Sequence, residues 1–240
     1  MTPSMTVGVC SCLSGAAGGE PRTEITVEIG GENAPRTMYF GMAEVVVAPE
    51  DIDDATVDFS NGEGVLPLRD FLTLSDDGYW YGEVSNYKRV QYTEAGTYTV
   101  TVKGARSINF TKTFYGPGEG SATVVEDSAR VVRFFSNDPR LVEIPSYALF
   151  FAEILEEVDV SKSGVASIGG RAFAYVSGVT VRLPPNPSFS FAADAFAGGA
   201  NMTLHLPVPK AEFVASESFP YGMSGSSWHF SDGSVATDPS

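Results

Sequence analysis

One pattern recurs four times in the C-terminal half of the sequence, and it constrains the fold more than any other feature. The pattern is a short alternation, in which two apolar residues flank a polar one, and each copy starts 23 or 24 residues after the previous copy. Alternation of this kind predicts a short β-strand. Because each unit is too small to bury its own apolar residues, a repeat of this length predicts a solenoid of stacked units. The four copies are at 158–160, 181–183, 204–206 and 228–230.

Two further sets of positions keep the same period between the predicted strands, and we expect both to fill the stacked interior. The first set is apolar: Ile144, Ile168, Phe191 and Val214. The second set follows four and five residues later: Ala148-Leu149, Ala172-Phe173, Ala195-Phe196 and Ser218-Phe219. Because the end units of a solenoid need caps, we expect a strand at 132–136 to close one end and the Trp228 strand to close the other. Ser136 interrupts the apolar column of that first strand.

The best-formed unit reads Ile-Gly-Gly-Arg-Ala-Phe at 168–173 and is followed by Gly178, while Pro184 and Pro207 end the neighbouring strands. In these features the C-terminal region resembles the BspA-type leucine-rich repeat family. The stretch at 228–233 looks like the closing strand of such arrays. The resemblance implies a small solenoid used for binding or assembly, in a family whose members occur on bacterial surfaces and in phage-encoded proteins.

The N-terminal half alternates apolar and polar residues in about seven short stretches separated by turn signals, which predicts an antiparallel β-sandwich. The hairpin sequence at 92–102 and the Asp-Phe-Ser-Asn-Gly turn at 58–62 resemble polycystic-kidney-disease-type (PKD) immunoglobulin-like domains. The resemblance implies a spacer or docking module without catalysis. The predicted fold class is therefore mainly β, an immunoglobulin-like (PKD-like) β-sandwich followed by a short leucine-rich-repeat solenoid.

Local composition divides the chain into five segments. The start is rich in Gly, Ala and Ser, as flexible segments are, and the end is short and polar. A Gly-Pro-Gly-Glu-Gly stretch supports neither strand nor helix, and it lacks the helix and Lys of a phosphate-binding loop. The predicted segments are a flexible arm at 1–22, a β-sandwich at 23–115, a linker at 116–120, a solenoid at 121–233 and a frayed tail at 234–240.

The charge balance excludes two classes of partner. Thirty acidic residues against fifteen basic ones give a formal net charge of −15, which repels phosphate backbones and anionic membrane surfaces. We therefore expect no nucleic-acid partner. No stretch approaches the roughly 18 apolar residues of a membrane span, so no membrane insertion is expected. The first residues lack the basic region of a secretory signal, which favours a protein that stays inside the cell or is assembled there, as virion proteins are.

Several groups contain the residue types of a known kind of functional site but lack the spacing or the further residues that such a site needs. The close carboxylates at 51–54 and 76–77 lack the fixed Gly and distal Glu of a calcium loop. Ser227, His229 and Asp232 contain the types of a catalytic triad but no nucleophile elbow. Cys10 and Cys12 are too close for a comfortable disulfide and lack a second ligand pair for zinc, so free thiols are expected. We predict no catalytic residues, no metal site and no cofactor.

The polar residue in the middle of each alternation defines a candidate binding site. If the flanking apolar residues point inward, the period of two sends the middle residues to the open face of the sheet. Solenoids bind partners through such extended faces, although any exposed strand face is polar, whatever its function. The residues two positions before these middle residues are at 157, 180, 203 and 227, and we expect their side chains to lean inward or toward the edge of the sheet. The candidate site residues are Asp159, Arg182, His205 and His229.

These observations predict a non-catalytic structural or binding protein. The favoured hypothesis is a phage virion component, such as a tail, fibre or head-decoration protein, assembled in the host cytoplasm as a homo-oligomer or array. Its partners would be other virion proteins and a host-surface protein or glycan. The alternative is a bacterial cell-surface adhesin that binds host protein or glycan. A third hypothesis is an intracellular interaction scaffold.

Overall fold

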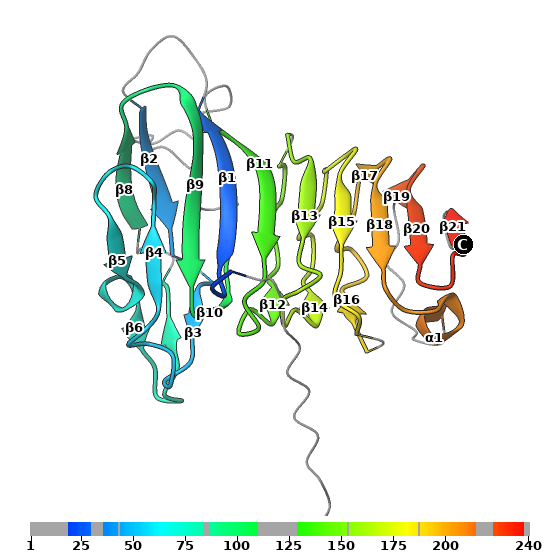
Figure 1. Ribbon diagram of the computed structural model, residues 1–240, viewed down its shortest axis with the longest axis horizontal. Helices are drawn as coiled ribbons and strands as arrows, with labels where there is room; N and C mark the ends of the chain where they lie inside the picture. Colours follow the sequence, from blue (N-terminus) through cyan, green and yellow to red (C-terminus); the bar gives the residue numbers. More distant parts are fainter. Residues whose placement is uncertain are drawn as a thin grey trace, which may run out of the picture.

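The computed structural model is mainly β and elongated (Figure 1). It describes residues 19–29, 36–42, 44–83, 87–109, 129–152, 154–186, 188–214 and 223–237. Within these residues, helical structure is confined to a 3-10 turn, η1 (Leu68–Phe71), and one short helix, α1 (Lys210–Val214). The predicted mainly β class is confirmed.

Two sheets contain most of the described strands, and β2 and β8 form a separate antiparallel pair. The strands of the N-terminal half are β1 (Thr23–Ile29), β2 (Arg36–Gly41), β3 (Val46–Val47), β4 (Thr56–Asp58), β5 (Val65–Pro67), β6 (Thr73–Leu74), β7 (Trp80–Tyr81), β8 (Tyr87–Tyr92), β9 (Gly96–Lys103) and β10 (Ala105–Ser107). Those of the C-terminal half are β11 (Ala129–Ser136), β12 (Glu143–Ile144), β13 (Glu157–Asp159), β14 (Ser167–Ile168), β15 (Thr180–Arg182), β16 (Ser190–Phe191), β17 (Gly199–Ala200), β18 (Thr203–Leu206), β19 (Met223–Ser224), β20 (Ser227–Phe230) and β21 (Val235–Thr237).

The larger sheet has ten strands in the order β21-β20-β18-β15-β13-β11-β1-β9-β4-β5. From β11 to β20 the strands are parallel, and each belongs to the next repeat unit. Val158, Val181, Leu204 and Trp228 pair in register across β13, β15, β18 and β20, and all four are buried. The predicted strand column of the repeat is therefore confirmed.

The smaller sheet has seven strands in the order β16-β14-β12-β10-β3-β7-β6. Its parallel part places Ile144, Ile168 and Phe191 in register on β12, β14 and β16, and all three are buried. The second predicted column is thus confirmed in three units. In the fourth unit the expected strand residue, Val214, is instead the last residue of α1.

A run of turns leads from each strand of the smaller sheet back to the larger one. Within it, the Leu149 N–H donates to the Ala172 carbonyl at 2.8 Å and the Phe173 N–H donates to the Ala195 carbonyl at 2.8 Å. Backbone hydrogen bonds therefore link neighbouring units here as well, and the result is a β-solenoid-like region of about four turns. The fourth pair of this column, Ser218-Phe219, lies outside the described residues.

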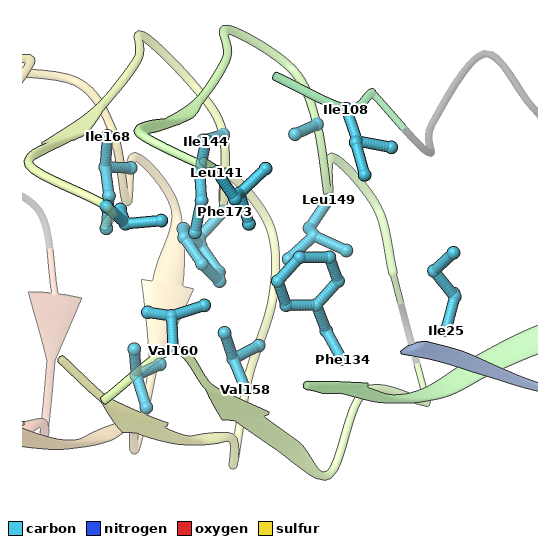
Figure 2. Close-up of a cluster of buried hydrophobic side chains, with 14 of the residues drawn as sticks. Ile25, Ile108, Phe134, Leu141, Ile144, Leu149, Val158, Val160, Ile168 and Phe173 are labelled. Atoms are coloured by element: carbon cyan, nitrogen blue, oxygen red, sulfur yellow. The ribbon is translucent and has the colours of Figure 1, made fainter. Parts of the chain in front are cut away.

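The core lies between the two sheets and the turns. In Figure 2, Phe134, Val158 and Val160 approach Ile144, Ile168 and Phe173 from the opposite side. The same contiguous cluster includes residues from the N-terminal half, such as Ile25 and Val57. Burial of apolar surface is worth roughly 25 cal/mol per Å². Because this buried surface is contiguous across both halves, one shared core stabilises the whole described chain.

The two halves of the chain also share both sheets. β1 pairs with β11 in the larger sheet and β10 pairs with β12 in the smaller one. Within the described residues, the strands of the segments predicted as a sandwich at 23–115 and a solenoid at 121–233 are therefore continuous in both sheets, and the predicted linker at 116–120 lies outside the described residues. The immunoglobulin-like arrangement is not confirmed. An alternating pattern predicts a strand but not its partner, which is why the sequence does not indicate this continuity.

The ends of the repeat differ from expectation in two ways. The first predicted cap, at 132–136, belongs to β11, which lies inside the larger sheet between β1 and β13. Ser136 is buried there, and its hydroxyl forms a hydrogen bond of 2.9 Å with that of Thr23, which offsets the cost of burying a polar group. At the other end, part of the predicted frayed tail is the strand β21, which pairs with β20. Residues 238–240 and most of the predicted arm, 1–18, lie outside the described residues.

Candidate functional site

The four predicted site residues form one row across the parallel part of the larger sheet. They stand at register-matched positions of four neighbouring strands: Asp159 on β13, Arg182 on β15, His205 on β18 and His229 on β20. Arg182 is exposed and the other three are half-buried. The residue before each of them in its strand is buried. Because successive side chains of a strand point to opposite faces, these four side chains lie on the outer face of the sheet. We call these four residues the Asp159 row.

A second row lies beside the first and on the same face. Glu157, Thr180, Thr203 and Ser227 pair in register across the same four strands and are half-buried. The expectation that they lean inward or to the edge is wrong, because residues two apart in a strand share a face. The period of two that locates the Asp159 row is therefore also the sequence signal for this row. We call the two rows together the polar face.

Glu157 connects three neighbouring strands of the polar face. One of its carboxylate oxygens lies 3.2 Å from Nε of Arg182 on β15, and the other lies 3.5 Å from Nε of Arg133 on β11. Exposed ion pairs of this kind contribute at most about 1 kcal/mol each. Their main effect is to orient the Arg182 guanidinium along the face.

Asp159 is less available to a ligand than its place in the row suggests. Its carboxylate accepts hydrogen bonds from the Ser161 N–H at 3.0 Å and from the Ser161 hydroxyl at 2.6 Å. These bonds hold the turn that follows β13. Aspartate commonly binds the backbone two residues ahead in such turns, so part of the role of Asp159 is structural.

The two histidines lie side by side at the C-terminal end of the row. Their ring centroids are 5.1 Å apart, with the rings inclined at 32°. Nε2 of His229 lies 3.1 Å from the Ser227 hydroxyl. Burial lowers the pKa of His205 below its ordinary value, and the positive charge of Arg182 and the neighbouring His229 lower it further. The Asp159 row therefore gains positive charge at His205 only below the pH at which a free imidazole titrates.

Titration of the imidazole protons by NMR is expected to give His205 a midpoint below about 6.5, the ordinary value for histidine. Arg182→Ala should raise this midpoint, because it removes a nearby positive charge. The unfolded chain binds a proton at His205 more readily than the folded chain does. The stability contributed by neutral His205 is therefore present above about pH 6.5 and is lost as the pH falls below it. A midpoint at or above the ordinary value would contradict this account.

The other groups of functional residue types do not come together into a site within the described residues. The Asp232 carboxylate accepts hydrogen bonds from the backbone N–H groups of Ser234 and Lys210, so it is engaged in the turn beyond β20. Two of the close carboxylates at 51–54 have arginine partners instead of a shared site: Asp53 forms an ion pair with Arg69, and Asp51 lies near Arg140. Across the same ranges, no three His, Cys, Asp or Glu side chains form a group that could hold a metal ion.

Comparisons with known proteins add no assignment. Neither the protein-family models, nor the curated proteins, nor the solved structures contain a match to this chain. In the part of the chain that the structure describes, no helix is both long and apolar enough to span a membrane. The candidate site is therefore the polar face, which consists of eight half-buried or exposed side chains in two rows on four parallel strands.

Proposed function

We propose that this protein is a non-catalytic binding protein that presents the polar face to a partner. The observation that carries the proposal is the in-register pairing of both rows across β13, β15, β18 and β20. Each strand has a fully buried residue between its two row positions, which fixes the spacing of the exposed side chains. A rigid array of this kind binds with little entropy lost in ordering its contact residues.

The composition of the polar face favours a polar partner. It combines carboxylates, a guanidinium, two imidazoles and three hydroxyl groups, which provide both hydrogen-bond donors and acceptors. The net charge of −15 opposes a polyanion. A host-surface protein or an uncharged glycan fits these conditions better than a nucleic acid or an anionic membrane does.

We propose a phage virion as the setting, with this chain as a tail, fibre or head-decoration component. The resemblance of the repeat units to BspA-type leucine-rich repeats supports this setting, and in it the PKD-like segment at 23–115 would dock to the particle. Weak contacts multiplied over many copies would then give firm attachment, because tethered sites have a high effective concentration. A bacterial cell-surface adhesin is the alternative. Mass spectrometry of purified phage particles separates the two, since only a virion component is recovered with the capsid.

Replacing Arg182, His205 and His229 together by Ala is expected to reduce attachment at least tenfold while the melting temperature stays nearly unchanged. Arg182 is exposed and both histidines lie half-buried on the outer face, outside the core, and surface substitutions usually change stability by no more than about 0.5 kcal/mol each. The triple change removes every cationic or imidazole group of the polar face. The measurement is attachment of bead-displayed protein to a panel of bacterial cells at pH 5.5 and pH 7.5.

The matched control replaces Thr97, Thr99 and Thr101 by Ala. These residues lie on β9, on the same larger sheet but away from the parallel strands. The control variant should attach as the parent protein does. Equal attachment by the parent and the polar-face variant at both pH values would refute the proposal and leave the face a structural role only.

A further inference from the structure

A second surface, on the turns of the solenoid, carries exposed aromatic side chains. Phe151 is 52% exposed and Tyr175 is 53% exposed. Their rings stack with centroids 4.6 Å apart and an interplanar angle of 12°. Phe150 packs edge-on against both rings, at 4.5 Å from Phe151 and 5.8 Å from Tyr175. We call Phe150, Phe151 and Tyr175 the aromatic corner.

The backbone at this corner favours a different residue. Phe151 has φ 56° and Tyr175 has φ 61°, which is the left-handed region that bulky residues avoid. Each N–H donates to the next unit, to Ala174 and Ala197 respectively. At the corresponding place in the next unit stands Gly198, with φ 71°. Glycine is thus the locally preferred residue, and two aromatic residues occupy the position against that preference.

Backbone strain of this kind persists where the surrounding structure imposes it, and it is frequent at ligand-binding positions. Core packing does not account for the two rings here, because the neighbouring Phe173 and Phe196 fill the interior and are fully buried. Gly198 in turn makes room for the exposed pair, since a Cβ there would lie 2.8 Å from Cδ1 of Tyr175. The next unit thus leaves space for the Tyr175 ring, and the stacked pair stays in contact with solvent.

Charged groups border the aromatic corner. Nε of Arg171 lies 3.2 Å from Oδ2 of Asp194, and both side chains are about half exposed. The Arg171 guanidinium also lies 6.0 Å from the centroid of the Tyr147 ring, and Tyr147 packs edge-on against Phe150 of the corner at 5.5 Å. The surface thus combines an apolar strip with adjacent hydrogen-bond donors and acceptors.

The size and charge of this surface restrict its ligand. Three partly exposed rings, Phe151, Tyr175 and the adjoining Tyr147, offer on the order of 300 Å², whereas a stable protein interface needs about 800 Å² from each partner. The net charge of −15 opposes anionic ligands. A pyranose ring matches both limits, because it has a small C–H-rich face that packs on aromatic rings and hydroxyl groups around its edge.

We propose that the aromatic corner binds a neutral oligosaccharide, with one pyranose packing its C–H face on the Phe151 ring, whose other face is held by Tyr175, and its hydroxyl groups toward Arg171 and Asp194. The sugars that fit have equatorial substituents, as in β-1,4-linked glucose and N-acetylglucosamine, since these leave a flat C–H face. This inference goes beyond the proposed function, because it concerns another surface and stands or falls independently of the polar face.

The test uses Phe151→Gly and Tyr175→Gly in the full chain, with cellotetraose and chitotetraose as probes. Glycine adopts the local backbone conformation freely, so each variant is expected to melt no more than a few degrees below the parent protein. Saturation-transfer NMR and calorimetry should show binding of at least one probe to the parent. Either substitution should weaken that binding on the order of tenfold or more.

Two controls make the result decisive. Asn201→Gly changes another exposed residue of left-handed conformation, φ 53°, without removing a ring, and should leave sugar binding unchanged. Tetragalacturonic acid, an anionic comparator, should bind less than the neutral probes. The proposal is overturned if the parent binds neither neutral probe, if the glycine variants bind as the parent does, or if the variants lose self-association in sedimentation instead of sugar binding.

Discussion

Phe173→Ala and Phe196→Ala are each expected to lower the free energy of unfolding by about 3–5 kcal/mol, the usual cost of truncating a buried Phe. Both side chains are fully buried, and their rings stack with centroids 5.1 Å apart. Phe196 also packs against Phe191 and Trp228, so it joins the third unit to β20, the last parallel strand. A cavity at either position would remove ring contacts that hold neighbouring units together.

Thermal melts and urea titrations measure this effect, and a drop in melting temperature of roughly 10 °C is expected for a chain of this length. The matched control is Lys162→Ala, in the exposed turn after β13, which should change stability by no more than about 0.5 kcal/mol. Phenylalanine variants that melt with the parent protein would show that these rings do not fill the stacked interior.

Asp138→Ala is expected to lower the free energy of unfolding by about 3 kcal/mol or more, the cost of breaking a buried charge pair. The Asp138 side chain is 1% exposed. It accepts hydrogen bonds from the Arg140 side chain at 2.8 and 2.9 Å and from the Gly104 N–H at 3.1 Å. Gly104 follows β9, whereas Asp138 follows β11, so this carboxylate links the two halves of the chain.

The loss should also depend on pH. Burial by itself would raise the pKa of Asp138, but the hydrogen bonds from Arg140 and from the Gly104 N–H outweigh it and hold the pKa below its ordinary value. The stability contributed by the carboxylate is therefore present above about pH 4, the ordinary pKa of Asp, and is lost as the pH falls through the lower folded value. Parent protein and variant should consequently converge in stability on acidification.

Asp53→Ala is the matched control for Asp138→Ala. Asp53 also pairs with an arginine, Arg69, but its side chain is 82% exposed. An exposed ion pair is worth at most about 1 kcal/mol, so this variant should melt close to the parent. Equal, small effects of both substitutions would mean that the buried carboxylate does not hold the two halves together.

The repeat and its columns are predictable from the sequence because they depend on local chemistry. A period of two decides which strand residues are buried, and a period of 23 or 24 residues decides which of them stack. Val158, Val181, Leu204 and Trp228 therefore align from the sequence alone, and the strands pair in that register. The same rule predicts the Asp159 row on one face. Applied to the residues two positions earlier, it also predicts Glu157 and its row on that face.

Tertiary structure decided which strands pair across the two halves and how the site residues behave. Ile29 of β1 pairs with Ala129 of β11, far along the chain, and neither strand carries a local mark of its partner. The lowered pKa of His205 and the engagement of Asp159 with Ser161 depend on what lies around each group in three dimensions. The left-handed backbone of Phe151 follows from closure of the solenoid turn, because a sequence pattern reports burial and period but not the dihedral angles that the neighbouring units impose.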